Sequence, residues 1–163
     1  MSTKFLEEMS AEEKRAVIHG CGADTEHLLA VLLELQGLSR QNYIDKDTAK
    51  LVAEELGLSL AKVYDVVTFY AMLSDKPRGR YVLEVCTSAS CYVSKSQRVI
   101  DWLQEELGVL PGGTTSDGLF TVTTTPCVGA CDIGPVIKVG DAVYGSLDQG
   151  RVRDLLAELR SAQ

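Results

Sequence analysis

The sequence has no long apolar run, no excess of basic residues and no secretion signal, and each absence excludes a class of protein. No stretch approaches the roughly 20 apolar residues of a membrane-spanning helix, so we expect no membrane insertion. The net charge of −7 repels nucleic-acid phosphates and anionic lipid headgroups, so we expect no nucleic-acid partner. Residues 1–13 are polar and acidic, unlike a signal peptide. We therefore expect a cytoplasmic protein, either free or in a complex at the cytoplasmic face of a membrane.

The signatures of nucleotide-binding and thiol-exchange enzymes are also missing. There is no G-x-G-x-x-G motif and no Walker lysine, and Gly112-Gly113 does not resemble a phosphate loop. The C-x-x-C motif of thioredoxin-type exchange enzymes is absent. Neither His19 nor His27 has a cysteine or acidic partner at metal-ligand spacing, so we assign them no role. We expect no catalytic residue and no substrate site on this chain itself.

The first half of the chain is predicted to be helical. Apolar residues recur there at i, i+3, i+4 and i+7 in three sets, each typical of one face of an amphipathic helix. The sets are Leu28, Val31, Leu32 and Leu35; Ala49, Val52, Ala53 and Leu56; and Val63, Val66, Val67 and Tyr70. Asp45 or Asp47 is a candidate cap for the second helix, which Gly57 ends, and Ser59 is a candidate cap for the third.

A polar segment with Pro and Gly, Ser74–Arg80, is the predicted linker, and the pattern changes after it. Strands, helices and a hairpin then follow in the order β-α-β-β-β-α. They are predicted at Tyr81–Val85, Val99–Leu107, Leu119–Thr125, Val136–Val139, Ala142–Tyr144 and Val152–Leu159, with Gly140-Asp141 as a type II′ turn. We therefore expect an α/β chain with a small all-α domain, residues 1–78, before a second domain, residues 79–163.

Four of the five cysteines follow the first two predicted strands. Cys86 and Cys91 come after the first strand, and Cys127 and Cys131 come after the second, so both pairs are placed in loops at the carboxyl ends of strands. A helical crossover makes such strands parallel neighbours, and parallel neighbours end at the same edge of a sheet. We therefore expect the four thiols to meet. In a reducing cytoplasm, clustered cysteines favour metal or redox chemistry over disulfides.

The pair spacings favour an iron–sulfur cluster and leave zinc as the alternative. Structural zinc sites also take four cysteines, but their pairs are usually C-x2-C or close to it. Here the pairs are C-x4-C and C-x3-C. The two interpretations are thus a [2Fe–2S] electron carrier on Cys86, Cys91, Cys127 and Cys131, and a zinc-stabilised structural or interaction module without a redox role.

Small residues surround these cysteines, and the loops contain no Lys, Arg or His. Backbone N–H groups can therefore point at sulfur, and the uncompensated negative charge predicts a low reduction potential. Cys21 stands apart in sequence and is interpreted as an ordinary half-buried cysteine. Tyr92 is expected either to shield the cluster or to pack in the core, and Trp102, on a helix face, is expected to pack.

These motifs resemble the thioredoxin-like [2Fe–2S] ferredoxin component of respiratory complex I, the bacterial NADH:quinone oxidoreductase. They equally resemble the homologous components of NAD-linked hydrogenases, formate dehydrogenases and electron-bifurcating complexes. The resemblance covers roughly residues 26–160 and depends most on the two cysteine loops and the stretch between them. The matching stretches are Asn42–Ile44, Val63–Tyr70, Cys86–Val93, Thr114–Thr121, and Cys127–Cys131 through Gly134–Val136.

The resemblance implies a thioredoxin-like ferredoxin domain, with a mixed four-stranded sheet and helices, behind the helical domain. It implies one [2Fe–2S] cluster on Cys86, Cys91, Cys127 and Cys131. It further implies partners: a flavoprotein subunit that binds NADH and FMN, and further iron–sulfur subunits. The chain would then exchange single electrons with that FMN within an NAD(P)H-dependent oxidoreductase, whether quinone reductase, hydrogenase, formate dehydrogenase, transhydrogenase or a bifurcating enzyme.

Several positions depart from the pattern of that family. Ser88-Ala89-Ser90 replaces a common Gly-Thr-Ala in the first loop, and Lys95 stands where a glycine is common. Asp65 also replaces a frequent glycine, and Asp45 a frequent proline. None of these is a predicted ligand. The first two departures are expected to change hydrogen bonding around the cluster and hence its potential.

Overall fold

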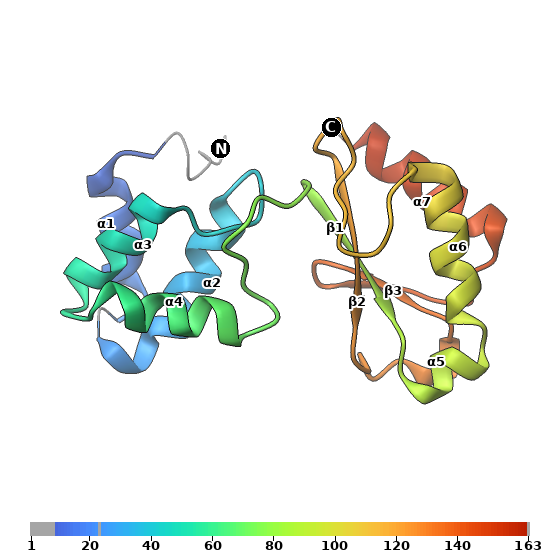
Figure 1. Ribbon diagram of the computed structural model, residues 1–163, viewed down its shortest axis with the longest axis horizontal. Helices are drawn as coiled ribbons and strands as arrows, with labels where there is room; N and C mark the ends of the chain where they lie inside the picture. The colour runs from blue at the N-terminus through green and yellow to red at the C-terminus, as the bar shows by residue number, and fades with distance from the viewer. Residues whose placement is uncertain (1–8, 23, 163) are drawn as a thin grey trace. The chain divides into compact units, whose positions relative to one another are not determined.

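The computed structural model describes residues 9–22 and 24–162 of the chain, which forms two compact units divided between Pro77 and Arg78 (Figure 1). Each unit has its own hydrophobic core. That they are separate domains, residues 1–78 and 79–163, stays a prediction. Among the described residues, no helix is both long enough and apolar enough to cross a membrane.

The first unit is entirely helical in its described part. Its elements are α1 (Ala11–Gly20), the 3-10 turn η2 (Thr25–His27), α2 (Leu28–Leu38), α3 (Lys46–Glu55) and α4 (Leu60–Phe69). The three predicted helices are confirmed, with Asp45 and Ser59 as the caps of α3 and α4. Gly57 follows α3 with a φ of +63°, which glycine adopts without a steric penalty.

Helix α1 was not predicted, because it is mostly polar and Ile18 is its one buried residue. The sequence does carry a signal for its start. The Ser10 hydroxyl accepts from the N–H of Glu13, and the Glu13 carboxylate accepts from the N–H of Ser10. This reciprocal pair is a capping box.

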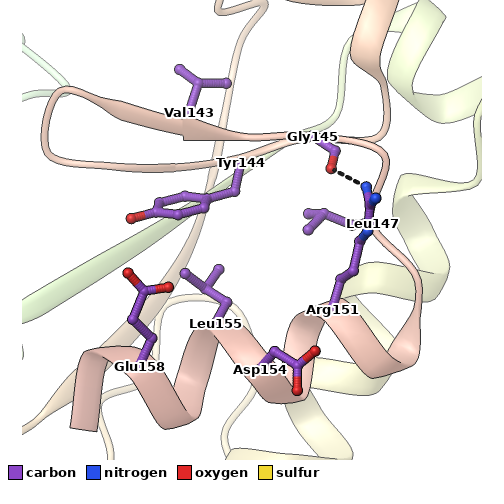
Figure 2. A pocket seen from close by; sticks show the side chains of 8 residues that line it. All are labelled: Val143, Tyr144, Gly145, Leu147, Arg151, Asp154, Leu155 and Glu158. Carbon is purple, nitrogen blue, oxygen red and sulfur yellow. Dashed lines mark hydrogen bonds between the residues drawn. The ribbon is translucent and has the colours of Figure 1, made fainter. Parts of the chain in front are cut away.

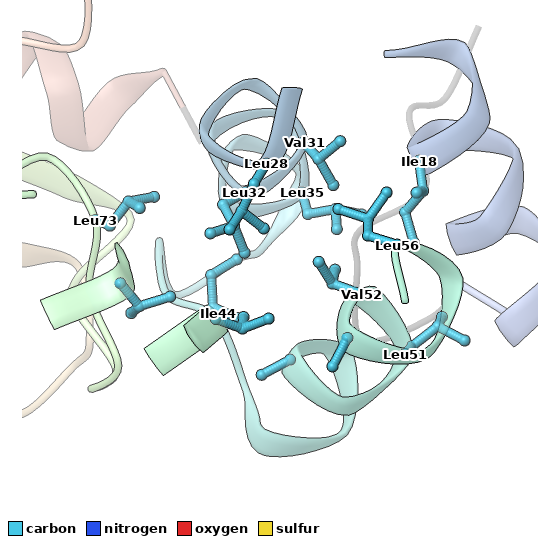
Figure 3. Close-up of a cluster of buried hydrophobic side chains, with 14 residues drawn as sticks. Ile18, Leu28, Val31, Leu32, Leu35, Ile44, Leu51, Val52, Leu56 and Leu73 are labelled. Atoms are coloured by element: carbon cyan, nitrogen blue, oxygen red, sulfur yellow. The ribbon is translucent and has the colours of Figure 1, made fainter. Parts of the chain in front are cut away.

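Apolar side chains from all four helices form the core of the first unit (Figure 3). Ile18, Leu32, Leu35, Val52 and Val63 are fully buried in it. Burying each such side chain contributes about 1.5–3 kcal/mol, which is what holds short helices of this kind together.

The predicted linker is shorter than expected, because both of its ends are bound. The side-chain amide of Gln36 accepts from the N–H of Ser74 and donates to the carbonyl of Met72, both at 2.8 Å. At the other end, the N–H of Gly79 donates to Thr121 Oγ1 at 2.6 Å. The residues between these two anchors make the connection.

The second unit contains one mixed sheet. Its elements are β1 (Tyr81–Cys86), α5 (Ala89–Val93), α6 (Ser96–Leu107), β2 (Phe120–Thr125), the 3-10 turn η3 (Cys131–Ile133), β3 (Ile137–Val139), β4 (Ala142–Tyr144) and α7 (Gln149–Ser161). The strand order is β2-β1-β3-β4, with β1 and β2 parallel and the other pairs antiparallel. The predicted mixed four-stranded sheet, its parallel first pair and its hairpin are confirmed, whereas the short helix α5 was not predicted.

Helices α6 and α7 pack side by side on one face of this sheet (Figure 1). Leu83, Phe120, Leu103 and Leu155 are buried between the two layers. Trp102 on α6 packs against the margin of this core, as predicted.

The two edges of the sheet differ in whether another segment pairs with them. The segment before β2 folds back along that strand: the N–H of Gly112 donates to the carbonyl of Val122 at 2.7 Å, and the N–H of Val122 donates to the carbonyl of Gly113 at 3.1 Å. At the opposite edge, β4 pairs with β3 alone. The β2 edge is therefore covered, and the β4 edge is open.

Candidate metal centre

The four predicted cysteine ligands all follow or end strands β1 and β2. Cys86 is the last residue of β1, and Cys127 lies two residues beyond the end of β2. Because the two strands are parallel neighbours, both cysteines lie at the same end of the sheet. The prediction that Cys91 lies in a loop is wrong, because the small residues after Thr87 form the first turn of α5 and place Cys91 on that helix. Cys131 opens η3.

Contacts to sulfur bring these elements together. The thiol of Cys91 donates to the sulfur of Cys86, and Ser90 hydrogen-bonds to Cys131. The sulfur atoms of Cys127 and Cys131 lie 3.6 Å apart. The four cysteines therefore form two pairs, one on β1 and α5 and one on the segment after β2.

The two pairs differ in their exposure to solvent. Cys86 and Cys91 are each 1% exposed and pack against Val136. Cys127 and Cys131 are exposed. A group held by both pairs would have one side buried in the second unit and the other side at its surface.

Backbone N–H groups point at the sulfur atoms. The N–H of Gly129 donates to Cys127 Sγ at 3.4 Å, from a turn in which Gly129 has a φ of +86°. The N–H groups of Ser88 and Val128 donate to Cys86. Such donors stabilise negative charge on sulfur, as metal-bound thiolates require.

The pKa values of the thiols follow from burial and from these hydrogen bonds. Burial, and then the hydrogen bond to Cys86 and its charge, raises the pKa of Cys91 to about 11. Burial also acts to raise the pKa of Cys86, but hydrogen bonds from the Ser88 N–H, the Cys91 thiol and the Val128 N–H outweigh it and lower that pKa. The hydrogen bond to Cys127, together with its charge, raises the pKa of Cys131. The pKa of Cys86 is thus lowered, while those of Cys91 and Cys131 are raised.

Gly134 lies beside the cysteine site, at van der Waals distance. A Cβ atom placed on Gly134 would lie 3.6 Å from Cys91 Sγ and 3.4 Å from Ser94 Oγ. In the sequence, Gly134 stands out only as part of a matching stretch, because its contact with Cys91 depends on the fold. Ser90, Val128 and Gly129 were anticipated only as members of small-residue loops.

The donor set fits a binuclear iron–sulfur cluster. Four thiols in two pairs match a [2Fe–2S] centre, in which each iron takes two protein ligands. Within residues 9–22 and 24–162, no three His, Cys, Asp or Glu side chains surround a single point that one metal ion could occupy. The thiols, the N–H donors and the absence of bulky side chains at Gly129 and Gly134 together suit a compact anionic group.

Other residues singled out in the sequence lie elsewhere or act differently. Cys21 belongs to the first unit and packs, half-buried, against its core. Each histidine contacts one carboxylate: His19 Nε2 lies 3.2 Å from Glu55, and His27 Nδ1 lies 2.7 Å from Asp24. Among the described residues, neither pair belongs to a group of three side chains that could hold a metal ion. Glu55 comes from another helix, so sequence spacing could not reveal that pair.

The structure excludes one of the two interpretations of Tyr92 and gives Lys95 a left-handed backbone. Tyr92 is 67% exposed, so it does not pack in the core. Lys95 has a φ of +69°, in the left-handed region that favours glycine. This conformation explains why a glycine is common at that position in the family that the chain resembles.

Comparison with known proteins identifies the family. Residues 14–160 match the family described as thioredoxin-like [2Fe-2S] ferredoxin. The NADP-reducing hydrogenase subunit HndA of Solidesulfovibrio fructosivorans is 36% identical over 132 residues, which cover 81% of this chain and 76% of that protein. One of the NADH-quinone oxidoreductase subunits of Rhizobium meliloti is 40% identical over 112 residues, covering 69% of this chain and 67% of that protein.

A solved structure shows the same fold. The crystal structure of an NAD+-reducing [NiFe]-hydrogenase in the air-oxidized state matches with a TM-score of 0.72 at 19% identity. The match covers 83% of this chain and 23% of that hydrogenase chain, so this chain spans about a quarter of its length. The predicted α/β fold and family are therefore confirmed: the chain belongs to the thioredoxin-like [2Fe–2S] ferredoxins, and its cofactor is a [2Fe–2S] cluster.

Proposed function

We propose that this chain is an electron-transfer subunit of an NAD(P)H-dependent oxidoreductase complex. Cys86, Cys91, Cys127 and Cys131 hold the [2Fe–2S] cluster, which supplies one-electron chemistry. The proposed electron partner is the FMN of a flavoprotein subunit, accompanied by further iron–sulfur subunits. The observation that carries this proposal is the meeting of two cysteine pairs at the carboxyl ends of two parallel, adjacent strands.

The chain's own residues position and insulate this centre. Cys86 and Cys91, both 1% exposed, bind from the buried side, and Cys127 and Cys131 close the exposed side. The N–H groups of Ser88, Val128 and Gly129 donate to sulfur. Because one side of the centre reaches the surface, electrons can pass to a partner without crossing the interior of the second unit.

Exposed apolar residues beside the centre support a protein partner. Tyr92 and Val93 on α5 are 67% and 80% exposed, next to the buried Cys91. Large apolar side chains exposed together at a functional site often mark a protein contact. The names of the relatives, which are subunits of hydrogenase and quinone oxidoreductase complexes, support the same conclusion.

Purification of the chain without oxygen tests the cluster and its ligands. We expect iron and labile sulfide in equal amounts and a visible absorption band that reductant bleaches. Cys127→Ser should strip or destabilise the cluster, while Cys21→Ser should leave it intact. A colourless protein containing zinc would favour the alternative of a structural module, and loss of iron from Cys21→Ser would overturn the ligand assignment.

The electron partner is tested in the complex that co-purifies under native conditions. NADH should reduce both the flavin and the cluster of the intact complex. With Cys127→Ser, the flavin should still be reduced, but the electron-spin signal of this chain's cluster should disappear. A complex without flavin, or a cluster that NADH leaves oxidised, would contradict the proposed electron exchange.

A further inference from the structure

Strand β4 and helix α7 enclose a hollow of about 340 Å³ in the second unit (Figure 2). Leu147 and Leu155, which are 8% and 4% exposed, contribute its apolar lining. The ring of Tyr144 extends from β4 toward Glu158, and Asp154 lies one turn earlier on α7 (Figure 2). The hollow therefore has an apolar lining with two carboxylates on its helical side.

These two carboxylates are available to a ligand. Within the described part of the chain, neither Asp154 nor Glu158 has a side-chain hydrogen bond or ion pair. Arg151 is the arginine that lines the hollow, and it is bound to the backbone: its Nη1 donates to the carbonyls of Gly145 at 3.4 Å and Ser146 at 3.0 Å. Carboxylates at i and i+4 share one helix face, so they repel phosphates and attract a basic group.

The backbone beside the hollow is also available. Val139 and Ala142 flank a two-residue turn and form a pair, followed by Lys138 with Val143. In a two-residue hairpin the flanking pair carries the hydrogen bonds, and the next pair does not. The N–H and C=O of Val143 therefore point away from β3, toward the open edge of the sheet.

The hollow shares a wall with the segment that carries Cys131. The N–H of Ser146 donates to the carbonyl of Ile133 at 2.5 Å, and a Cβ on Gly145 would collide with the Ile133 side chain at 2.6 Å. Ile133 ends the turn η3 that Cys131 begins. Gly145 therefore lies against the last residue of the turn that Cys131 begins.

We propose that this hollow receives an extended segment of a partner protein. The segment adds as a strand to β4 and places a lysine or arginine side chain between Asp154 and Glu158. Strand addition satisfies the outward N–H and C=O of Val143, and the basic side chain pairs with the free carboxylates. The apolar stem of that side chain lies on Leu147 and Leu155. The inference rests on the proposed function in one respect, which is that the partner is another subunit of the same complex.

The first test uses the cluster-loaded chain and a synthetic probe. The probe is a capped heptapeptide of alternating valine and lysine, and its control has glutamate at each lysine position. We expect the lysine peptide to bind and to slow hydrogen exchange at the Val143 amide by about tenfold or more, which corresponds to about 1.4 kcal/mol. The glutamate peptide should do neither.

Charge variants distinguish binding in the hollow from attraction by the overall negative charge of the chain. Asp154→Lys with Glu158→Lys should raise the dissociation constant of the lysine peptide about tenfold or more. A control with the same change in net charge, Asp101→Lys with Glu34→Lys, should leave it nearly unchanged, because both residues are exposed elsewhere. The milder pair Asp154→Asn with Glu158→Gln should weaken binding in the same direction.

The same variants then test the partner in the co-purified complex. Reversal of Asp154 and Glu158 should release a partner subunit that the control variant retains. A Val143 amide that the lysine peptide does not protect would overturn the inference. So would equal effects of the charge reversal at Asp154 and Glu158 and of the control reversal at Asp101 and Glu34. Binding of free arginine without protection of the Val143 amide would mean that the hollow takes a small cation, and it would also overturn the inference. Failure of the proposed function is distinguishable, because it would appear as missing iron and sulfide in every variant.

Discussion

The sulfur atoms of Cys127 and Cys131 lie 3.6 Å apart, and both thiols are exposed to solvent. In cluster-free protein we expect oxidised glutathione to join these two thiols first. The two thiols lose two electrons and two protons, and glutathione disulfide is reduced to two thiols. Cys86 and Cys91 should react later, because both are 1% exposed and exchange requires access.

Alkylation followed by mass spectrometry of proteolytic peptides measures which pair has formed. The oxidised protein should not accept iron and sulfide until dithiothreitol reduces it. Cys131→Ser serves as the control, because it removes the exposed pair and leaves the buried one. Earlier oxidation of Cys86 and Cys91 would contradict the exposure argument.

Tyr92 and Val93 are predicted to contact the electron partner. Replacing both with serine should weaken binding of the flavoprotein about tenfold or more, because it removes exposed apolar area of the kind that anchors interfaces. Retention of the partner during gel filtration, and the rate of cluster reduction by NADH, measure the effect. The visible and electron-spin spectra of the cluster should not change.

Leu110 supplies a matched control for this prediction. It is 61% exposed and lies in the segment before β2, outside helix α5 and outside both cysteine pairs. Leu110→Ser should leave partner binding intact. Equal losses at the two sites would mean that general surface hydrophobicity, rather than contact beside the cluster, retains the partner.

Lys95→Gly is expected to stabilise the second unit by about 1 kcal/mol. The left-handed backbone at Lys95, with its φ of +69°, is unfavourable for a residue that has a Cβ and free for glycine. Trp102 is the single tryptophan of the chain and packs in this unit, so its fluorescence reports the unfolding of this unit in denaturant.

The control for Lys95→Gly lies two residues further along. Gln97 is exposed within α6, where glycine costs about 1 kcal/mol relative to a good helix former. Gln97→Gly should therefore destabilise the unit that Lys95→Gly stabilises. A loss of stability in both variants would show that the conformation of Lys95 carries no strain.

Asp45→Ala should lower the free energy of unfolding of the first unit by about 1 kcal/mol at neutral pH, because Asp45 caps α3. Burial acts to raise the pKa of Asp45, but hydrogen bonds from Thr48 and Asp47 and the charge of Lys14 outweigh it and lower that pKa. A lowered pKa means that the stabilisation is present above the unfolded-state pKa, near 4, and is lost as the pH falls through the folded-state value.

The difference between Asp45→Ala and the unaltered chain should therefore shrink in acid. Far-UV circular dichroism measures helix loss, and Trp102 fluorescence follows the second unit separately. Asp47→Ala is the control, because Asp47 is exposed and its partner Lys50 is a surface contact. A difference that grows as the pH falls would contradict the direction of the Asp45 pKa shift.

The parts of the fold that could be predicted are those with a strong local signal. Val31, Leu35, Val52 and Val63 repeat with the helical period, and their helices formed as expected. The parallel pairing of β1 with β2 followed from the crossover helix between them. Helix α1 has a weak apolar face, so its only clear signal was the capping box at Ser10.

For the candidate site, the sequence predicts which residues take part, and the structure adds an asymmetry between them. Spacing singled out the four cysteines, but nothing in the sequence shows that Cys86 is buried and Cys127 exposed. Burial depends on how α5 folds over the end of β1, which is a tertiary effect. The hollow between Tyr144 and Glu158 is also a tertiary effect, because it forms only when α7 packs beside the β3–β4 hairpin.

The parallel pairing of β1 and β2 imposes an order on the synthesis of this protein. A ribosome releases Cys86 and Cys91 well before the second strand, and the two pairs can meet only after Phe120–Thr125 has docked beside Tyr81–Cys86. The nascent chain therefore carries Cys86 and Cys91 without Cys127 and Cys131 for as long as the ribosome takes to translate the residues between the two pairs. With the proposed ligands, cofactor insertion must follow that docking, and the bound cofactor would then link the segments on either side of the crossover.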